Sequence, residues 1–190
     1  MNQRSLTIIT VVIVLLIAAG AGGWYYLHPN KQLQNASQSP VIGKATLGGT
    51  APQFAVATTS GLFDLSKTDK PVFLEIFATW CPHCQRETTV IDKLYAKYQS
   101  QMDFVGVSGS NTAMDGTSAA SQNDLLAWIK KFDVKYPVAY DPLTEVADLY
   151  LQGGFPTIAV IDKSKNIVYL NSGEISYDEL NGAVQKALHE

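Results

Sequence analysis

The feature that most constrains this chain is a short apolar strand followed at once by two cysteines at the start of a helix. Residues 72–77 read Val-Phe-Leu-Glu-Ile-Phe, and residues 79–84 read Thr-Trp-Cys-Pro-His-Cys. An apolar run of this kind is typical of a strand in a sheet that is covered on both faces. At a helix start, Cys81 lies near the positive end of the helix dipole and beside unpaired N–H groups, which stabilise a thiolate. Cys84 lies on the same helix face, so the pair can cycle between dithiol and disulfide.

Other uses of a Cys-x-x-Cys motif fit this chain less well. Cys81 and Cys84 are its two cysteines, whereas a structural zinc site normally needs four ligands. Covalent haem attachment needs a histidine directly after the second cysteine, where this chain has Gln85. A structural disulfide or a pair of inert thiols stays open, although a bridge across so short a loop removes little unfolded-state entropy. The motif therefore favours redox work and predicts no metal site.

The motif also carries a resemblance to a known family. Together with Gly-Phe-Pro-Thr at residues 154–157, it resembles the thioredoxin superfamily, and within it the TlpA/ResA-like membrane-anchored thiol-disulfide oxidoreductases. The similarity covers about residues 48–188. It implies a thioredoxin-like α/β fold, with a central mixed β-sheet flanked by helices on both faces, an N-terminal β-hairpin and a transmembrane anchor helix. Residues 54–57 and 62–65 are expected to form that hairpin.

The resemblance implies roles for individual positions. Cys81 is the attacking cysteine that forms the mixed disulfide, and Cys84 resolves it. Pro156 matches the cis-proline that packs against the cysteine pair, with a trans proline in a plain loop as the alternative. Phe155, just before it, is expected to contact a bound peptide. The motif and groove positions are Trp80, Pro82, Phe155 and Pro156.

Three more residues are candidates for proton transfer and for tuning the couple. Glu75 lies in the apolar strand, where burial raises a carboxyl pKa; by resemblance it assists the resolving cysteine, and a satisfied core carboxylate is the alternative. Glu87 shares the helix face of Cys84, and by resemblance it tunes the cysteines; an ordinary solvated charge is the alternative. His83 can give a hydrogen bond or positive charge to the Cys81 thiolate, or it is a spectator in an exposed turn. Pro-His between the cysteines resembles DsbA-type oxidases, so the net direction stays open.

The start of the chain differs in composition from the remainder. Residues 1–5 are expected to form a cytoplasmic n-region. Residues 6–27 carry no charge over a length that crosses a bilayer, which predicts a transmembrane anchor. A cleaved signal peptide is the alternative, because the Ala-Gly-Ala sequence at residues 19–21 matches a cleavage site. Residues 28–47 are polar and predict a tether to a thioredoxin-like domain at 48–190.

The charge pattern also predicts where the domain lies. Positive charge precedes the uncharged run, so the rest of the chain should end up outside the cytoplasm, periplasmic or on the outer surface. The expected protein is single-pass in the cell membrane with a cytoplasmic N-terminus. A net charge of −3 without a basic cluster argues against nucleic acid as a partner. The Ser/Thr/Ala/Gly-rich loop at 110–123 is of a length that is usually functional, but its composition indicates no ligand.

These observations predict an extracytoplasmic thiol-disulfide oxidoreductase that acts on proteins through a redox-active Cys81-Cys84 pair, in cytochrome c maturation or in disulfide formation or repair. Expected partners are proteins with dithiols or disulfides, a membrane protein that renews the pair, and apocytochrome c if the direction is reductive. No organic cofactor is needed. A copper-binding chaperone is an alternative that lacks a third soft ligand inside the domain. A thiol peroxidase is another, but that chemistry wants a lone peroxidatic cysteine.

Overall fold

The structure is a computed structural model that describes residues 43–190. The predicted n-region, the anchor at 6–27 and residues 28–42 of the predicted tether lie outside the described residues. Within residues 43–190, none of the helices combines the length and the apolarity needed to span a membrane. The last part of the predicted tether packs onto the domain: Ala45 is buried, and its N–H donates to the carbonyl of Leu149 at 2.8 Å.

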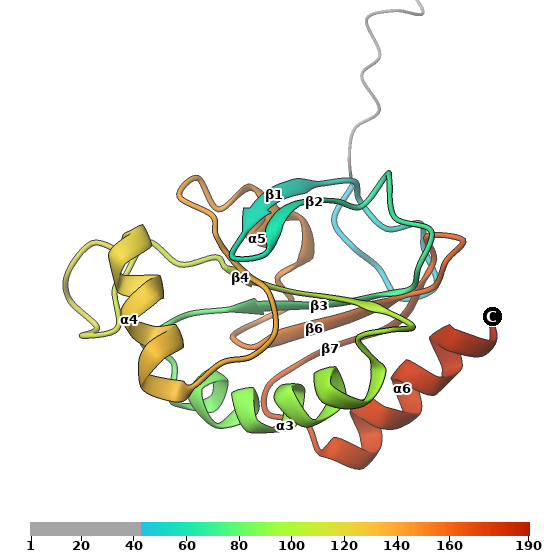
Figure 1. Ribbon diagram of the computed structural model, residues 1–190. Helices are drawn as coiled ribbons and strands as arrows, with labels where there is room; N and C mark the ends of the chain where they lie inside the picture. Colours follow the sequence, from blue (N-terminus) through green and yellow to red (C-terminus); the bar gives the residue numbers. More distant parts are fainter. Residues whose placement is uncertain (1–42) are drawn as a thin grey trace, which may run out of the picture. The chain divides into compact units, whose positions relative to one another are not determined.

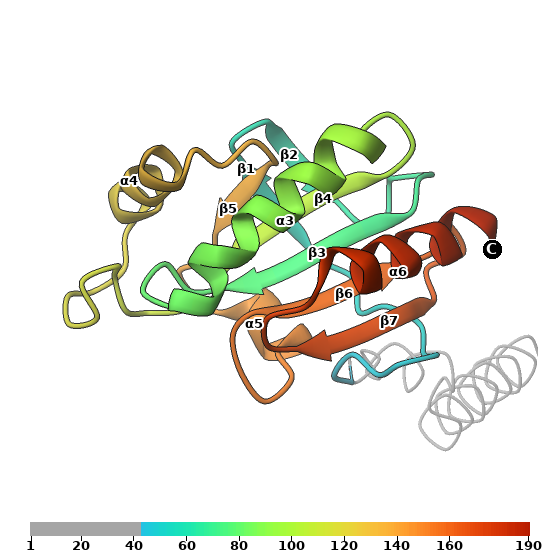
Figure 2. The same cartoon turned by 90° about the horizontal axis from the view of Figure 1, so that it is seen from below.

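The described chain forms one mixed sheet with helices on both faces, as predicted (Figures 1 and 2). The strands are β1 (Ala55–Thr58), β2 (Gly61–Asp64), β3 (Val72–Phe77), β4 (Asp103–Ser108), β5 (Val138–Tyr140), β6 (Thr157–Ile161) and β7 (Ile167–Ser172). The helices are α3 (Pro82–Tyr98), α4 (Gln122–Phe132), α5 (Glu145–Tyr150) and α6 (Tyr177–His189). Their order in the sheet is β2-β1-β5-β4-β3-β6-β7, with β3 parallel to β4 and antiparallel to β6. The predicted hairpin is β1–β2, and it extends this sheet by pairing with β5.

The central strand β3 is buried along its whole length because helices cover both of its faces. Side chains alternate between the two faces of a strand. Phe73 and Phe77 therefore join the core under α3, α4 and α6, whereas Leu74 and Ile76 join the core under α5. Figure 1 shows α3 and α6 on one side of the sheet and α5 on the other. Glu75, between these apolar residues, points to the α3 side, where the cysteines lie.

Helix α3 begins where the sequence predicts it. Cys81 is its N-cap residue with extended backbone angles, and Pro82 occupies the first helical position, where its missing N–H removes no hydrogen bond. The first turn contains no acidic side chain, and no side chain caps it. The sulfur of Cys81 therefore stands at a helix N-terminus with no competing negative charge in that turn.

Candidate active site

The two cysteines differ in their surroundings although they are three residues apart. Both are free thiols; Cys84 is fully buried, and Cys81 retains 4% of its exposure. Burial raises the pKa of the Cys84 thiol strongly, and the negative charge of Glu75 adds to the shift. The Cys81 thiol instead donates to the carbonyl oxygen of Phe155 at 3.5 Å. Cys81 is thus the more accessible of the two sulfurs, and Cys84 stays protonated beneath it.

Glu75 is a fully buried carboxyl on the same side of the sheet as Cys84. The hydroxyl of Tyr136 donates to its Oε2 at 2.7 Å, and its Oε1 has no hydrogen-bond partner among the described residues. Gly106 lies opposite Glu75 in β4, and a Cβ there would meet the Tyr136 ring at 2.9 Å, so the glycine leaves room for this contact.

Desolvation is the main reason why the pKa of Glu75 rises to about 8, while the Tyr136 hydrogen bond opposes the rise and the charge of Glu87 adds to it. A carboxyl with this pKa exchanges protons near neutral pH.

Glu87 is also buried, which excludes the interpretation that it is an ordinary solvated helix charge. Its two carboxylate oxygens accept the N–H of Ile175 at 3.3 and 3.2 Å. Burial is the first cause that raises the pKa of Glu87 to about 7, and the Ile175 hydrogen bond opposes it. Two carboxyls with raised pKa values therefore lie under the motif, in β3 and in α3.

The exposed side of the motif carries a different set of contacts. His83 is 58% exposed, and its Nδ1 lies 3.1 Å from Glu174 Oε2 and 2.8 Å from Arg86 Nη2. The predicted hydrogen bond from His83 to Cys81 is not among the contacts of this nitrogen. Arg86 binds Glu174 rather than its neighbour Glu87.

Phe155 and Pro156 lie where the resemblance implied. The Phe155–Pro156 peptide bond is cis, and Pro156 is buried. The half-buried Phe155 ring meets the Trp80 ring edge to face, with centroids 6.0 Å apart. Trp80 is 37% exposed, and the Phe155 carbonyl accepts from the Cys81 thiol, so this aromatic pair lies next to Cys81. Pro82 is exposed at the first position of α3.

Sequence reasoning missed the side chains that attach the loop after β4 to the motif. Trp80 Nε1 donates to Ser110 Oγ at 2.8 Å, and Thr79 Oγ1 donates to Asp124 Oδ2 at 2.7 Å. The other oxygen of Asp124 accepts the N–H of Met114 at 2.9 Å. The loop at 110–121 is therefore fastened to the residues that precede Cys81. A polar side chain at each end of a long loop was the available signal, but it does not reveal the partner.

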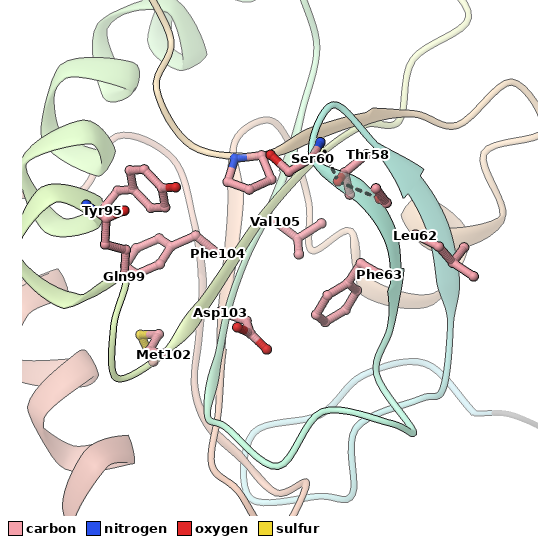
Figure 3. Close-up of a pocket in the computed structure, with 12 residues that line it drawn as sticks. Thr58, Ser60, Leu62, Phe63, Tyr95, Gln99, Met102, Asp103, Phe104 and Val105 are labelled. Carbon is pink, nitrogen blue, oxygen red and sulfur yellow. Dashed lines mark hydrogen bonds between the residues drawn. The ribbon is translucent and has the colours of Figure 1, made fainter.

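Pockets lie elsewhere in the domain. A hollow of about 310 Å³ lies among the β1–β2 hairpin, the start of β4 and the end of α3, as Figure 3 shows. Phe63, Tyr95 and Phe104 contribute its aromatic lining, and neither cysteine lines it. Within residues 43–190 there is no group of three or more His, Cys, Asp or Glu side chains arranged to hold a metal ion. The cysteine pair is the chemically reactive group of the described domain.

Comparisons with known proteins agree with this geometry. The sequence model of the Redoxin family matches residues 46–186. The thiol-disulfide oxidoreductase ResA of Bacillus cereus (strain ZK / E33L) is 35% identical over 147 residues, covering 75% of this chain and 79% of ResA.

Solved structures show the same fold. A protein of Chlorobium tepidum assigned as the thiol:disulfide interchange protein DsbE superposes with a TM-score of 0.66 at 25% identity, covering 76% of this chain and 99% of that one. DsbF of Mycobacterium tuberculosis gives 0.61 at 28%, covering 73% and 99%. This chain therefore belongs to the Redoxin family of the thioredoxin superfamily, and it is a ResA-like thiol-disulfide oxidoreductase.

Proposed function

We propose that this protein is held in the cell membrane by residues 6–27 and reduces disulfides of other proteins outside the cytoplasm, with apocytochrome c as a substrate. The observation that carries the proposal is the asymmetry of the cysteine pair. Cys81 is the N-cap residue of a helix and lies beside the Phe155 carbonyl, whereas Cys84 is fully buried near two carboxyls. A couple built in this way can accept a substrate sulfur at one cysteine and release it with the other.

In the first step the Cys81 thiolate attacks one sulfur of a substrate disulfide. A mixed disulfide forms between Cys81 and that sulfur, the substrate S–S bond breaks, and the second substrate sulfur leaves as a thiolate that takes a proton. The aromatic rings of Trp80 and Phe155 border this position, and the backbone at Phe155 can hold the peptide once Cys81 no longer donates to its carbonyl.

In the second step Cys84 resolves the mixed disulfide. The Cys84 thiol gives its proton to Glu75, whose pKa near 8 suits proton transfer near neutral pH, and its sulfur attacks Cys81. The Cys81–Cys84 bond forms as the bond between Cys81 and the substrate breaks. The substrate sulfur leaves as a thiolate and takes a proton, so the substrate is released as a dithiol that has gained two electrons. Glu87 is the second carboxyl close enough to the motif to take part in this proton balance. A membrane thiol-redox protein then reduces the pair again.

The direction of net electron flow is tested by the reduction potential of the couple. The full chain, in detergent, is equilibrated with glutathione buffers, and the fraction of oxidised Cys81–Cys84 is measured by mass after alkylation. A potential of about −270 mV or lower is expected for a reductant of the thioredoxin kind. A potential of about −120 mV would mark an oxidant instead and would contradict the reductive direction.

The substrate is tested with an oxidised peptide that contains Cys-x-x-Cys-His, the haem-attachment sequence of c-type cytochromes. The reduced full chain is expected to reduce this peptide faster than a matched Cys-x-x-Cys peptide in which the histidine is replaced. Equal rates would indicate a general protein disulfide reductant and would contradict apocytochrome c as a preferred substrate. Labelling of Cys81 by a membrane-impermeant thiol reagent in intact cells tests the location, and protection from that reagent until lysis would contradict it.

A further inference from the structure

A cluster of one acidic and two basic side chains lies beside the cysteine pair and has no part in the proton transfers above. Arg86 donates from Nη2 to Glu174 Oε2 at 2.7 Å, and its Nε lies 3.1 Å from both carboxylate oxygens. His83 Nδ1 lies 3.1 Å from the same Oε2. These contacts join residues that are 88 and 91 positions apart in the chain. The cluster therefore exists only because the turn before α6 meets the start of α3.

Both basic residues belong to the helix turns that carry the cysteines. His83 stands between Cys81 and Cys84, and Arg86 follows two positions later. The hydrogen bonds to Glu174 are the first cause that raises the pKa of the Arg86 guanidinium, and the charge of the Cys81 sulfur contributes as well. His83 and Arg86 thus lie in the first two turns of the helix whose N-cap residue is Cys81.

Positive charge beside a cysteine stabilises its thiolate, and a disulfide whose reduced form is stabilised is a stronger oxidant. The first turn of α3 has no acidic side chain that could offset Arg86 and His83. The offset for Arg86 comes from Glu174, which accepts hydrogen bonds from its guanidinium. The hydrogen bonds from Arg86, and after them His83, lower the pKa of Glu174 to about 2, so it keeps its negative charge at any physiological pH.

We propose that Glu174 is a positioning residue for the exchange reaction: it holds Arg86 beside His83 and offsets the charge of Arg86, which makes the Cys81–Cys84 disulfide a weaker oxidant. A Pro-His pair between the cysteines, typical of an oxidase, can then serve a reductant. This inference rests on the proposed role of Cys81 as the attacking sulfur.

The test compares full-length Glu174→Gln with the wild-type chain and with Glu145→Gln, which removes an equal charge from an exposed position in the first turn of α5. Two readouts are used: the equilibrium constant for reduction of the disulfide by glutathione, and the rate of Cys81 alkylation by iodoacetamide at pH 6. Glu174→Gln is expected to raise both about two- to five-fold, the range of an exposed ion-pair interaction. Glu145→Gln is expected to change neither, and Glu174→Asp to restore most of the wild-type value.

A second comparison uses Arg86→Gln with and without Glu174→Gln. In that background the added Glu174→Gln change is expected to lose most of its effect, because the charge that Glu174 offsets is gone. An unchanged constant in Glu174→Gln would overturn the inference, and so would an equal effect of Glu174→Gln with and without Arg86. If the wild-type chain formed no mixed disulfide at Cys81, the proposed function itself would fail, and that outcome is separate from these.

Discussion

Carboxyl groups on the two sides of the cysteine pair have pKa values that are shifted in opposite directions. On the buried side, Glu75 and Glu87 have few polar partners, and desolvation raises their pKa values to about 8 and about 7. On the exposed side, Glu174 meets Arg86 and His83, and their hydrogen bonds lower its pKa to about 2. The same functional group therefore exchanges protons beneath the motif and holds a permanent charge above it. Packing, rather than residue type, assigns the two tasks.

The largest effects are expected from removing one sulfur at a time. Cys81→Ser should abolish exchange and form no mixed disulfide, because no thiolate is left at the helix N-terminus. Cys84→Ser should form the mixed disulfide but release it at least about 1,000-fold more slowly, since no internal sulfur can resolve it. Mass spectrometry of alkylated samples after mixing with an oxidised peptide measures both. Trapping of substrate on Cys84 in the Cys81→Ser variant would reverse the assignment of the two sides.

On the buried side, Glu75→Gln removes the proton acceptor and keeps a carbonyl oxygen for the Tyr136 hydroxyl. The resolving step is expected to slow about 100-fold, a usual contribution of a positioned acid or base. Attack by Cys81 should change far less. Stopped-flow measurement of mixed-disulfide formation and decay separates the two steps, with Glu145→Gln as the exposed control. Decay within two-fold of wild type would return Glu75 to the interpretation as a satisfied core carboxylate.

The raised pKa values also predict how stability depends on pH. Below pH 4.5 each acid is protonated in both the folded and the unfolded chain, so it adds no pH dependence. Above that, the unfolded chain ionises first, and folding stability falls by about 1.4 kcal/mol per pH unit for each acid. The fall continues to about pH 7 for Glu87 and about pH 8 for Glu75. Urea unfolding of the reduced protein from pH 4 to 9 measures it.

The matched variant for this pH dependence is again Glu75→Gln. It should roughly halve the slope between pH 4.5 and 7, where Glu87 still contributes, and remove the slope between pH 7 and 8. Glu174→Gln should leave the slope in this window unchanged because that carboxyl titrates at lower pH. A wild-type curve that rises with pH in this window would show that the buried carboxyls are ionised in the folded protein.

The smallest effect is expected where the loop after β4 is fastened to the motif. Ser110→Ala leaves the Trp80 Nε1 hydrogen without its acceptor at a position where the ring is partly exposed, so the cost in unfolding free energy should be about 1 kcal/mol. Asn111→Ala, at an exposed position in the same loop, is the control. Urea unfolding and the KM for an oxidised peptide are the measurements. Equal results for the two variants would show that the loop does not position Trp80.

Most of the fold was predictable because its signals are local. The apolar strand at 72–77 and the helix start at Cys81 follow from the residue pattern, and both are confirmed. The burial of Glu75 follows from its place in that strand. The partners were not predictable: Tyr136 lies 61 positions from Glu75, and Ser110 lies 30 positions from Trp80. The sequence around a serine or tyrosine does not indicate which distant group its hydroxyl will bind.

By itself, the amino-acid order determined that a strand would be covered on both faces and that a cysteine would cap the helix after it, because periodicity and capping depend on neighbouring residues. Only the tertiary structure decided that Glu87 would be buried and that Glu174 would bind Arg86. The burial of Glu87 and the ion pair of Arg86 both depend on how the turn before α6 packs against α3. Desolvation and ion pairing are set by groups brought together from distant parts of the chain, so they appear only once the chain has folded.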